Sequence, residues 1–232
     1  MMRGRHLLVA LALAATSGSV LADQVNVSNP GATYRNQSFS GGAFRATVVS
    51  GYVGETGGFG GTANSFLTFC LERDEFVSLG TTYYAELDTV ARDGGSGGPS
   101  PDPISYETAA LYQEFRSAGS FGNLAGLTNN LLDTANEIRS LQLAIWHAED
   151  EMPGSEYTND TLAVALYNWA VANNSGSIGN VRVMNLWTSS DGTGHAQDML
   201  TIVPLPTAAW AGLGSLAGVF GMGYARRRSH NA

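Results

Sequence analysis

Residues 138–146 read IRSLQLAIW, and this stretch decides how the centre of the chain folds. Ile138, Gln142 and Trp146 recur every fourth position, a spacing that places their side chains on one face of a helix. Gln142 then enters an apolar face, where a buried amide without partners costs about 1–3 kcal/mol. We therefore expect a helix whose Gln142 amide either satisfies backbone groups of neighbouring strands or takes part in chemistry.

The segments around this helix predict strands on both sides of a helical region. Apolar residues at helical spacing predict helices that open at 105–108, cover 129–150 and cover 160–172. β-Branched and aromatic residues between turn-forming residues predict strands over 44–49, 65–71, 81–87, 180–187 and 197–203. This order indicates an α+β domain with a β-sandwich or barrel-like sheet and a helical insertion.

Residues 92–103 (RDGGSGGPSPDP) have the composition of a surface loop between these two parts. Asp93 and Asp102 lie in this loop, but they lack the spacing of the oxygen ligands in an EF-hand. We therefore expect a connecting loop without a metal ion.

The composition excludes several classes of protein. The 232 residues carry a formal charge of −8, and the sequence contains no lysine. A nucleic-acid binder needs clustered Lys and Arg to neutralise phosphates, so nucleic acid is not an expected partner. Cys70 is the single cysteine, which excludes an internal disulfide and any metal site built from several cysteines.

Residues 1–22 have the three parts of a secretory signal peptide. Arg3, Arg5 and His6 supply the basic start, residues 7–15 supply the apolar stretch, and residues 20–22 (VLA) form a small-residue cleavage site. We therefore expect an exported protein whose extracellular domain spans residues 23–202.

The C-terminal segment predicts a membrane anchor. Residues 207–225 contain no charged residue and are just long enough for a transmembrane helix to cross a hydrocarbon core of about 30 Å. Arg226, Arg227 and Arg228 follow at once, and a basic flank stays on the cytoplasmic side of the membrane.

The order of parts over 203–228 resembles a PEP-CTERM sorting signal, in the variant form in which Leu205 replaces the usual glutamate. The matching residues are Val203, Pro204 and Pro206 before the helix and Arg226, Arg227 and Arg228 after it. The resemblance implies a Gram-negative bacterium and processing by an exosortase. It implies an inner-membrane anchor before processing, then a place on the cell surface or in the extracellular matrix.

Cys70 lies in a predicted strand (SFLTFCL, 65–71), where an exported protein keeps either an inert buried thiol or a reactive one. Together, residues 69–71 (FCL) and 142–146 (QLAIW) resemble the Cys–Gln thioester domains of bacterial adhesins. The family motif is Thr-Gln-x-Ala-Ile-Trp, and Leu141 stands in the place of the threonine.

This second resemblance implies a thioester between Cys70 and Gln142, with Trp146 and His147 as supporting residues. It implies a covalent adhesin that captures an amine- or hydroxyl-bearing target on a surface or in a matrix. Such a protein is not a turnover enzyme, and the reaction requires no cofactor and no metal ion.

Three alternatives belong to other functional classes. The first is a cysteine hydrolase using Cys70, His147 and Asp150, although a histidine beside the acids of 149–151 is typical of a solvated surface. The second is a metal site using His147 and His195, which lacks a third ligand. The third is a non-catalytic matrix or exopolysaccharide-associated protein, with aromatic platforms drawn from Tyr83, Tyr84, Tyr157, Trp187 and Trp210.

Overall fold

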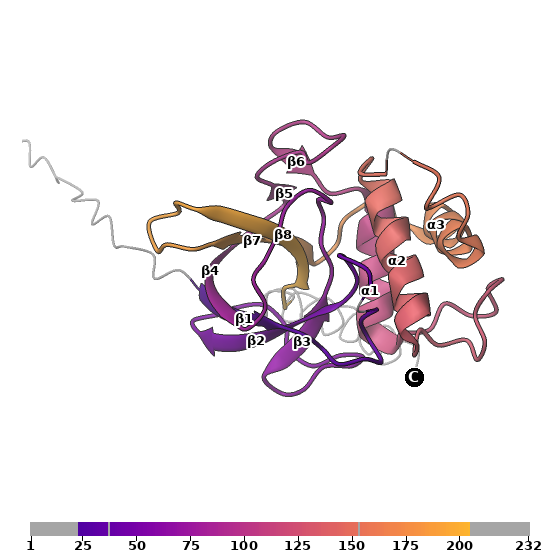
Figure 1. Cartoon of the computed structure of the whole chain (residues 1–232), viewed down its shortest axis with the longest axis horizontal. Helices are drawn as coiled ribbons and strands as arrows, with labels where there is room; N and C mark the ends of the chain where they lie inside the picture. Colours follow the sequence, from indigo (N-terminus) through magenta and orange to yellow (C-terminus); the bar gives the residue numbers. More distant parts are fainter. Residues whose placement is uncertain (1–22, 37, 153, 205–232) are drawn as a thin grey trace, which may run out of the picture.

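The computed structural model describes residues 23–36, 38–152 and 154–204, drawn in Figure 1. The elements follow the order β1 (Asp23–Ser28), β2 (Phe44–Ser50), β3 (Ser65–Thr68), β4 (Thr81–Asp88), β5 (Val90–Ala91), β6 (Asp102–Pro103), α1 (Tyr106–Ala118), α2 (Ala135–Ala148), α3 (Thr161–Asn173), β7 (Val181–Trp187) and β8 (His195–Ile202). The fold is α+β, and its helices are inserted between two groups of strands, as predicted.

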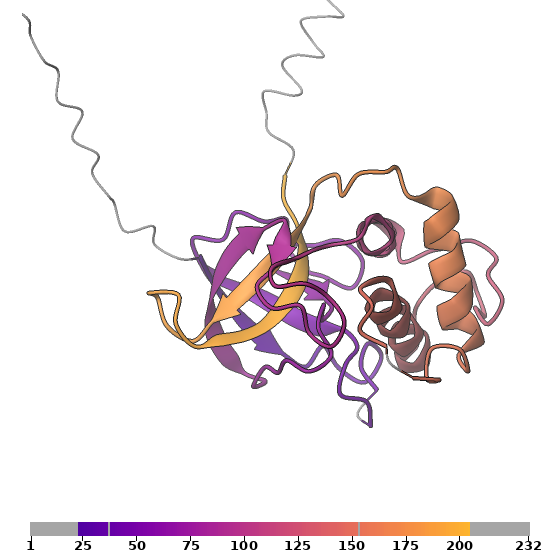
Figure 2. The same ribbon diagram turned by 90° about the horizontal axis from the view of Figure 1, so that it is seen from above.

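One antiparallel sheet holds six of the strands in the order β3-β2-β1-β4-β7-β8. The sheet curls, as Figure 2 shows, and its ends meet just after β3. Cys70 forms an isolated antiparallel bridge with Met199 of β8, and the N–H of Leu200 donates to the carbonyl of Phe69 at 3.2 Å. Cys70 therefore lies where the two end strands of the sheet approach each other.

Strand β3 ends at Thr68, short of the predicted residue 71, and the extended segment that continues it through Cys70 is buried on both faces. Leu67, Phe69 and Leu71 belong to the core beneath the helices, while Phe66 and Cys70 belong to a second core formed mainly by the sheet. This alternation is the two-residue period of an extended strand. The continuous apolar run therefore reflects burial on two sides.

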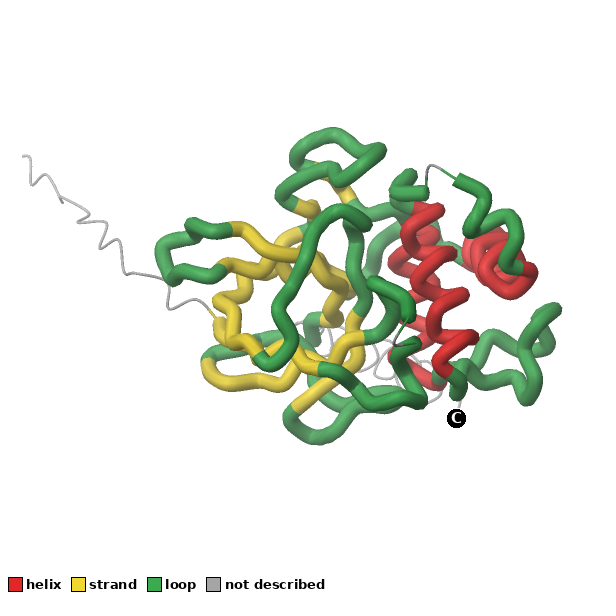
Figure 3. Tube along the Cα trace, in the orientation of Figure 1, coloured by secondary structure: helices red, strands yellow, loops and turns green. Residues whose placement is uncertain are grey.

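The helices gather on one side of the strands (Figure 3), and each begins at a residue that caps its own backbone. Ser105, Thr134 and Asp160 accept hydrogen bonds from N–H groups three residues later, which satisfies donors that the first helical turn leaves free. Helix α2 lies between the two cores: Leu141 and Ile145 join one, and Leu143 and Trp146 join the other.

The structure corrects the start of one predicted helix and adds a strand that was not predicted. The central helix was expected from residue 129, but α2 begins at Ala135, because Thr134 adopts the extended conformation of a cap and Asn130 has a φ of 66°. Strand β1 was not predicted, although it pairs with both β2 and β4 at the centre of the sheet. Its six residues lie directly after the predicted cleavage site and lack aromatic residues.

The loop over 92–103 is a loop for most of its length, and its backbone is tied to the domain. Both oxygens of Glu151 accept hydrogen bonds from this loop, one from the N–H of Ser96 and one from the N–H of Gly97, each at 3.0 Å. Glu151 is thus buried, with 1% of its surface exposed, whereas Asp150 is exposed. His147, which was expected on a solvated surface, is half-buried.

Several predicted segments lie outside the described residues: the signal peptide (1–22), Pro206, the membrane helix (207–225) and Arg226, Arg227 and Arg228. Val203 and Pro204 follow β8 directly. The N–H of Val203 donates to the carbonyl of Asn180 at 2.9 Å, whereas Pro204 is exposed. In the part of the chain that the structure describes, no helix combines the length and apolarity that a membrane span requires.

Candidate functional site

Cys70 and Gln142, the pair that the resemblance to thioester adhesins implies, are neighbours in the structure. The Gln142 amide donates from Nε2 to the carbonyl of Cys70 at 2.9 Å, and its Oε1 accepts from the N–H of Cys70 at 3.2 Å. Gln142 is fully buried and Cys70 is 2% exposed. The side chain of the helix residue thus lies directly against the strand residue, which is 72 positions earlier in the chain.

A second backbone donor converges on the same Gln142 oxygen. The N–H of Gly42 donates to Oε1 at 3.3 Å, so this oxygen accepts from two main-chain groups. Such a pair of donors stabilises negative charge that develops on a carbonyl oxygen. The sequence did not lead us to Gly42, although the glycine pair at 41–42, one residue before the predicted strand, was a visible signal.

The loop carrying these glycines packs closely on the helix. A Cβ atom at Gly41 would lie 2.5 Å from Cη2 of Trp146 and 3.0 Å from Cγ of Gln142, so only glycine permits this approach. Gly42 has a φ of +98°, which also favours glycine. Gly41 and Gly42 therefore pack directly against Gln142 and Trp146.

The thiol of Cys70 has a buried environment with one cationic group acting on it. Burial raises the pKa of the Cys70 thiol far above its usual range, and the charge of Arg35 opposes this rise. Both residues line a cavity of about 50 Å³, together with Phe44 and Trp146. This volume is large enough for a water molecule or a small amine group. A buried Nη1 of Arg35 and the buried Nε1 of Trp146 have no hydrogen-bond partner among the described residues.

Trp146 and His147 have different roles. Trp146 shares the helix face of Gln142, and its ring lies 5.5 Å from that of Phe39 and 5.8 Å from the guanidinium carbon of Arg73. His147 is about 140° away from Gln142 around the helix. Its ring stacks on Tyr157 at 3.7 Å and meets the ring of Tyr167 edge-on at 4.6 Å. The structure therefore places Trp146 at the site and His147 in a separate aromatic group.

These positions argue against the cysteine hydrolase alternative. Within the described residues, no hydrogen bond joins Cys70 to His147 or Asp150. Burial lowers the pKa of His147, with Asp150 acting in the opposite direction. A hydrolytic site would instead require the histidine within hydrogen-bond reach of the thiol.

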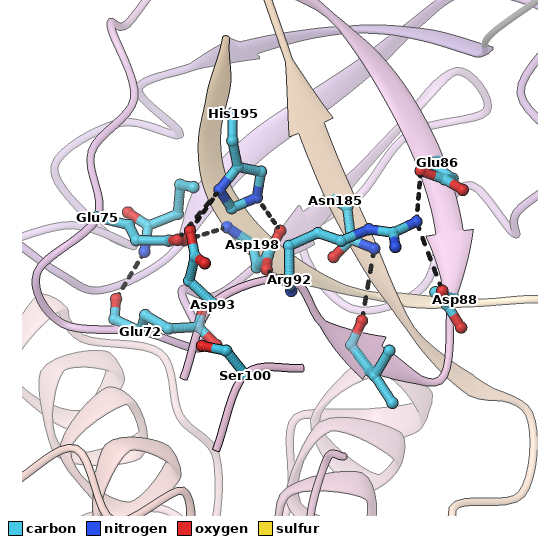
Figure 4. A network of polar contacts seen from close by, with 12 residues as sticks. Glu72, Glu75, Glu86, Asp88, Arg92, Asp93, Ser100, Asn185, His195 and Asp198 are labelled. Carbon is cyan, nitrogen blue, oxygen red and sulfur yellow. Dashed lines mark hydrogen bonds and ion pairs between the residues drawn. The ribbon is translucent and has the colours of Figure 1, made fainter. Parts of the chain in front are cut away.

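The structure brings together a second group of titratable side chains near Cys70, shown in Figure 4. We call Glu72, Glu75, Asp93, His195 and Asp198 the carboxylate–histidine cluster. His195 Nε2 lies 2.8 Å from Asp198, and its Nδ1 lies 3.3 Å from Glu75 and 3.4 Å from Asp93. His195 thus has several acidic partners, where the sequence indicated only His147 as a companion.

Charges within this cluster shift one another strongly. Burial first, then the charges of Asp198 and Glu75, raise the pKa of Glu72 to about 11. Burial alone would lower the pKa of His195, but its hydrogen bonds to Asp198 and Glu75 raise that pKa to about 10. The raised pKa favours the imidazolium form of His195, in which both ring nitrogens can donate to the neighbouring carboxylates.

Of the aromatic residues considered as platforms for sugar binding, those that the structure describes lie in different parts of it and do not form one surface. Tyr83 is 3% exposed and Tyr157 is stacked on His147. Tyr84 and Trp187 line a cavity of about 490 Å³ together with Asp23 and Glu86. Trp210 lies outside the described residues.

No family model, curated protein or solved structure matches the chain.

Proposed function

We propose that this chain is an exported surface protein that stores an internal thioester between Cys70 and Gln142 and uses it for covalent adhesion or matrix cross-linking. The observation that carries the proposal is the pair of reciprocal hydrogen bonds between the Gln142 amide and the backbone of Cys70 in a buried setting. These bonds hold the side-chain amide of Gln142 against the backbone of the residue that carries the only thiol of the chain.

The proposed chemistry has two balanced steps. First, the Cys70 sulfur attacks Cδ of Gln142; a C–S bond forms, the C–N bond breaks, and the thiol proton leaves with the amide nitrogen as ammonia. Second, an amine on a partner attacks the thioester carbonyl. An amide bond to the partner then forms, and the Cys70 thiol is released. A hydroxyl nucleophile would give an ester by the same route.

The surroundings of Gln142 favour the first step. As the sulfur attacks, negative charge develops on Oε1, which already faces the N–H groups of Gly42 and Cys70. Such hydrogen bonds, at 3.2–3.3 Å here, tighten as charge develops, and oxyanion donors of this kind typically contribute about 3–4 kcal/mol to transition-state stabilisation. Burial also limits access of bulk water to the thioester once it has formed.

Export and anchoring form the second part of the proposal. The described domain ends with β8, and Pro204 is already exposed two residues later. A C-terminal transmembrane helix over 207–225 can therefore leave from a surface position. We propose that an exosortase processes this tail and releases the domain to the cell surface or matrix of a Gram-negative bacterium.

Intact-mass spectrometry of the purified protein tests the thioester. We expect a mass one ammonia below that of the sequence, a Cys70 that resists alkylation in the folded state, and recovery of both mass and thiol with methylamine. Cys70→Ala and Gln142→Ala should each abolish the deficit. Gln113→Ala, which changes an exposed glutamine on α1, should retain it.

A full-sequence mass together with a freely alkylating Cys70 would refute this function. The Gln142 amide would then serve only the backbone groups it contacts. The non-catalytic matrix protein would become the better proposal, with the cavity beside Tyr84 and Trp187 as its candidate contact surface.

A further inference from the structure

The carboxylate–histidine cluster gathers four acidic side chains around a single histidine. Glu75, Asp93 and Asp198 lie within 3.4 Å of His195, and Glu72 lies beside Glu75 and Asp198. The guanidinium of Arg92 points elsewhere and pairs with Glu86 at 2.7 Å and Asp88 at 3.7 Å. Grouped carboxylates that are taken out of water need a cation or a proton, because unpaired buried charges are costly.

Glu72 supplies an independent sign of a missing partner. The residue is 3% exposed, and its Oε2 has no hydrogen-bond partner among the described residues. A carboxylate oxygen of Glu72 lies within 4.8 Å of oxygens of both Glu75 and Asp198. Buried acceptors in native proteins normally have a partner, so this unpartnered oxygen points to a bound group.

The spacing of these three carboxylates suits one metal ion. Oxygens that bind the same Ca²⁺ at 2.3–2.6 Å lie at most about 5 Å apart. Glu72, Glu75 and Asp198 offer only oxygen donors, the type that hard cations prefer. Backbone hydrogen bonds position two of these carboxylates. The N–H of Asp198 donates to Oε2 of Glu75 at 2.9 Å, and the N–H of Arg92 donates to Oδ2 of Asp198 at 2.5 Å.

We propose that Glu72, Glu75 and Asp198 bind a hard divalent cation, with Ca²⁺ as the fitting example. His195 orients Asp198 through Nε2, which lies 2.8 Å from Oδ1. Asp93, whose side chain is 66% exposed, marks the solvent side of the cluster and the entry for the ion. This site is distinct from the proposed thioester and does not depend on it.

The site would join segments that are far apart in the sequence. Glu72 and Glu75 lie two and five residues after Cys70. Asp198 lies in β8, and the next residue, Met199, forms the bridge to Cys70. A bound cation would therefore hold together the two ends of the curled sheet. Binding should stabilise the fold, because the ion binds the folded chain in preference to the unfolded one.

The test is calorimetric titration of CaCl₂ into the full-length protein after removal of metal with a chelator. We expect one Ca²⁺ per chain with a Kd below about 1 mM and a rise of about 2–6 °C in the unfolding midpoint at 10 mM CaCl₂. Glu72→Gln should weaken binding at least tenfold. Asp191→Asn, an exposed acid in the turn before His195, should leave it unchanged.

Further variants keep the proposal open to refutation. If Glu72→Gln fails to fold, Glu75→Gln should show the same loss. Cys70→Ala should bind Ca²⁺ as the parent does, which separates this site from the thioester. Absence of Ca²⁺ binding, or equal binding by Glu72→Gln, would overturn the proposal. Binding of Zn²⁺ but not Ca²⁺, lost in His195→Asn, would also overturn the proposal. The ligands would then be His195, Glu75 and Asp93.

Discussion

Gln142 shows at the scale of a single residue how an amide in an apolar face is accommodated. Its oxygen accepts from Gly42 and Cys70, and its nitrogen donates to Cys70, so its main hydrogen-bonding groups are engaged. The neighbouring Leu141, which stands where thioester adhesins have threonine, is fully buried in the core beneath the helices. The site therefore lacks a hydroxyl at that position, and backbone groups supply the polar contacts.

Gly41→Ala should destabilise the fold and lower the yield of the thioester. The added methyl group would lie 2.5 Å from the Trp146 ring, so the loop or the ring must move. We expect a loss of about 1–3 kcal/mol in the free energy of unfolding, measured with urea. The mass deficit should also fall, because Gly42 N–H moves with the loop.

The matched control for this prediction is Gly154→Ala, since no atom lies within 4 Å of a Cβ there. If Gly41→Ala and the parent protein have the same free energy of unfolding, the loop can shift to accept the methyl group and does not fix the position of Gln142.

Helix α2 shows, at the scale of elements, how one segment positions several groups. Its capping box at Thr134 and Glu137 sets where the helix starts, and its length carries Gln142 and Trp146 to the strand end. Glu149, the residue that follows α2, contacts the N-terminus of α1. Both the N–H and the hydroxyl of Ser105 donate to Glu149 Oε1, at 3.1 and 2.6 Å. The contact links the end of α2 to the N-cap of α1.

Glu149 should make the stability of the domain depend on pH. Burial raises the pKa of Glu149 to about 7, while hydrogen bonds from Ser105 and Thr108 act against this rise. The folded chain then binds more protons at this group than the unfolded chain between pH 4.5 and about 7. Protonated Glu149 therefore adds to the free energy of unfolding below pH 4.5, and this addition is lost as the pH rises to about 7.

Urea titrations of the parent and Glu149→Gln across this pH range measure the effect. The free energy of unfolding of the parent should fall relative to the variant by at most about 1.4 kcal/mol per pH unit. Parallel curves would mean that Glu149 ionises normally in the folded state.

At the scale of the whole molecule, we expect the folded domain and the C-terminal tail to have separate functions, covalent capture and membrane anchoring. The curled sheet and the helices bury Cys70 and Gln142, while the described chain leaves the domain at an exposed Pro204. Anchoring is therefore expected to depend on the C-terminal segment alone. The stored thioester is expected to depend on the domain alone.

Replacing Arg226, Arg227 and Arg228 with Ala should impair membrane orientation and processing of the tail, because the basic flank holds the cytoplasmic end. We expect less mature protein at the cell surface, measured by fractionation and by the C-terminal mass of the released product. Arg182→Ala, which changes an arginine within the domain, should process normally. Unchanged delivery of the triple variant would count against the sorting signal.

The sequence by itself determined the α+β class and most of the helices and strands. These features follow from local periods: four-residue spacing for the helix face and two-residue alternation for the strands. A single cysteine and a glutamine on an apolar helix face can also be read from the sequence, but the hypothesis that they pair came from the resemblance to thioester adhesins.

Only the tertiary structure decided which residues surround that pair and which acids share a site. Gly42 reaches Gln142 across 100 positions, and the N–H of Asp198 reaches Glu75 across 123. The closure of the curled sheet brings residues 70–75 against β8, and no local pattern encodes this meeting. His147 was drawn to the site by its place beside Trp146, but helical geometry turns it to another face, where it stacks on Tyr157.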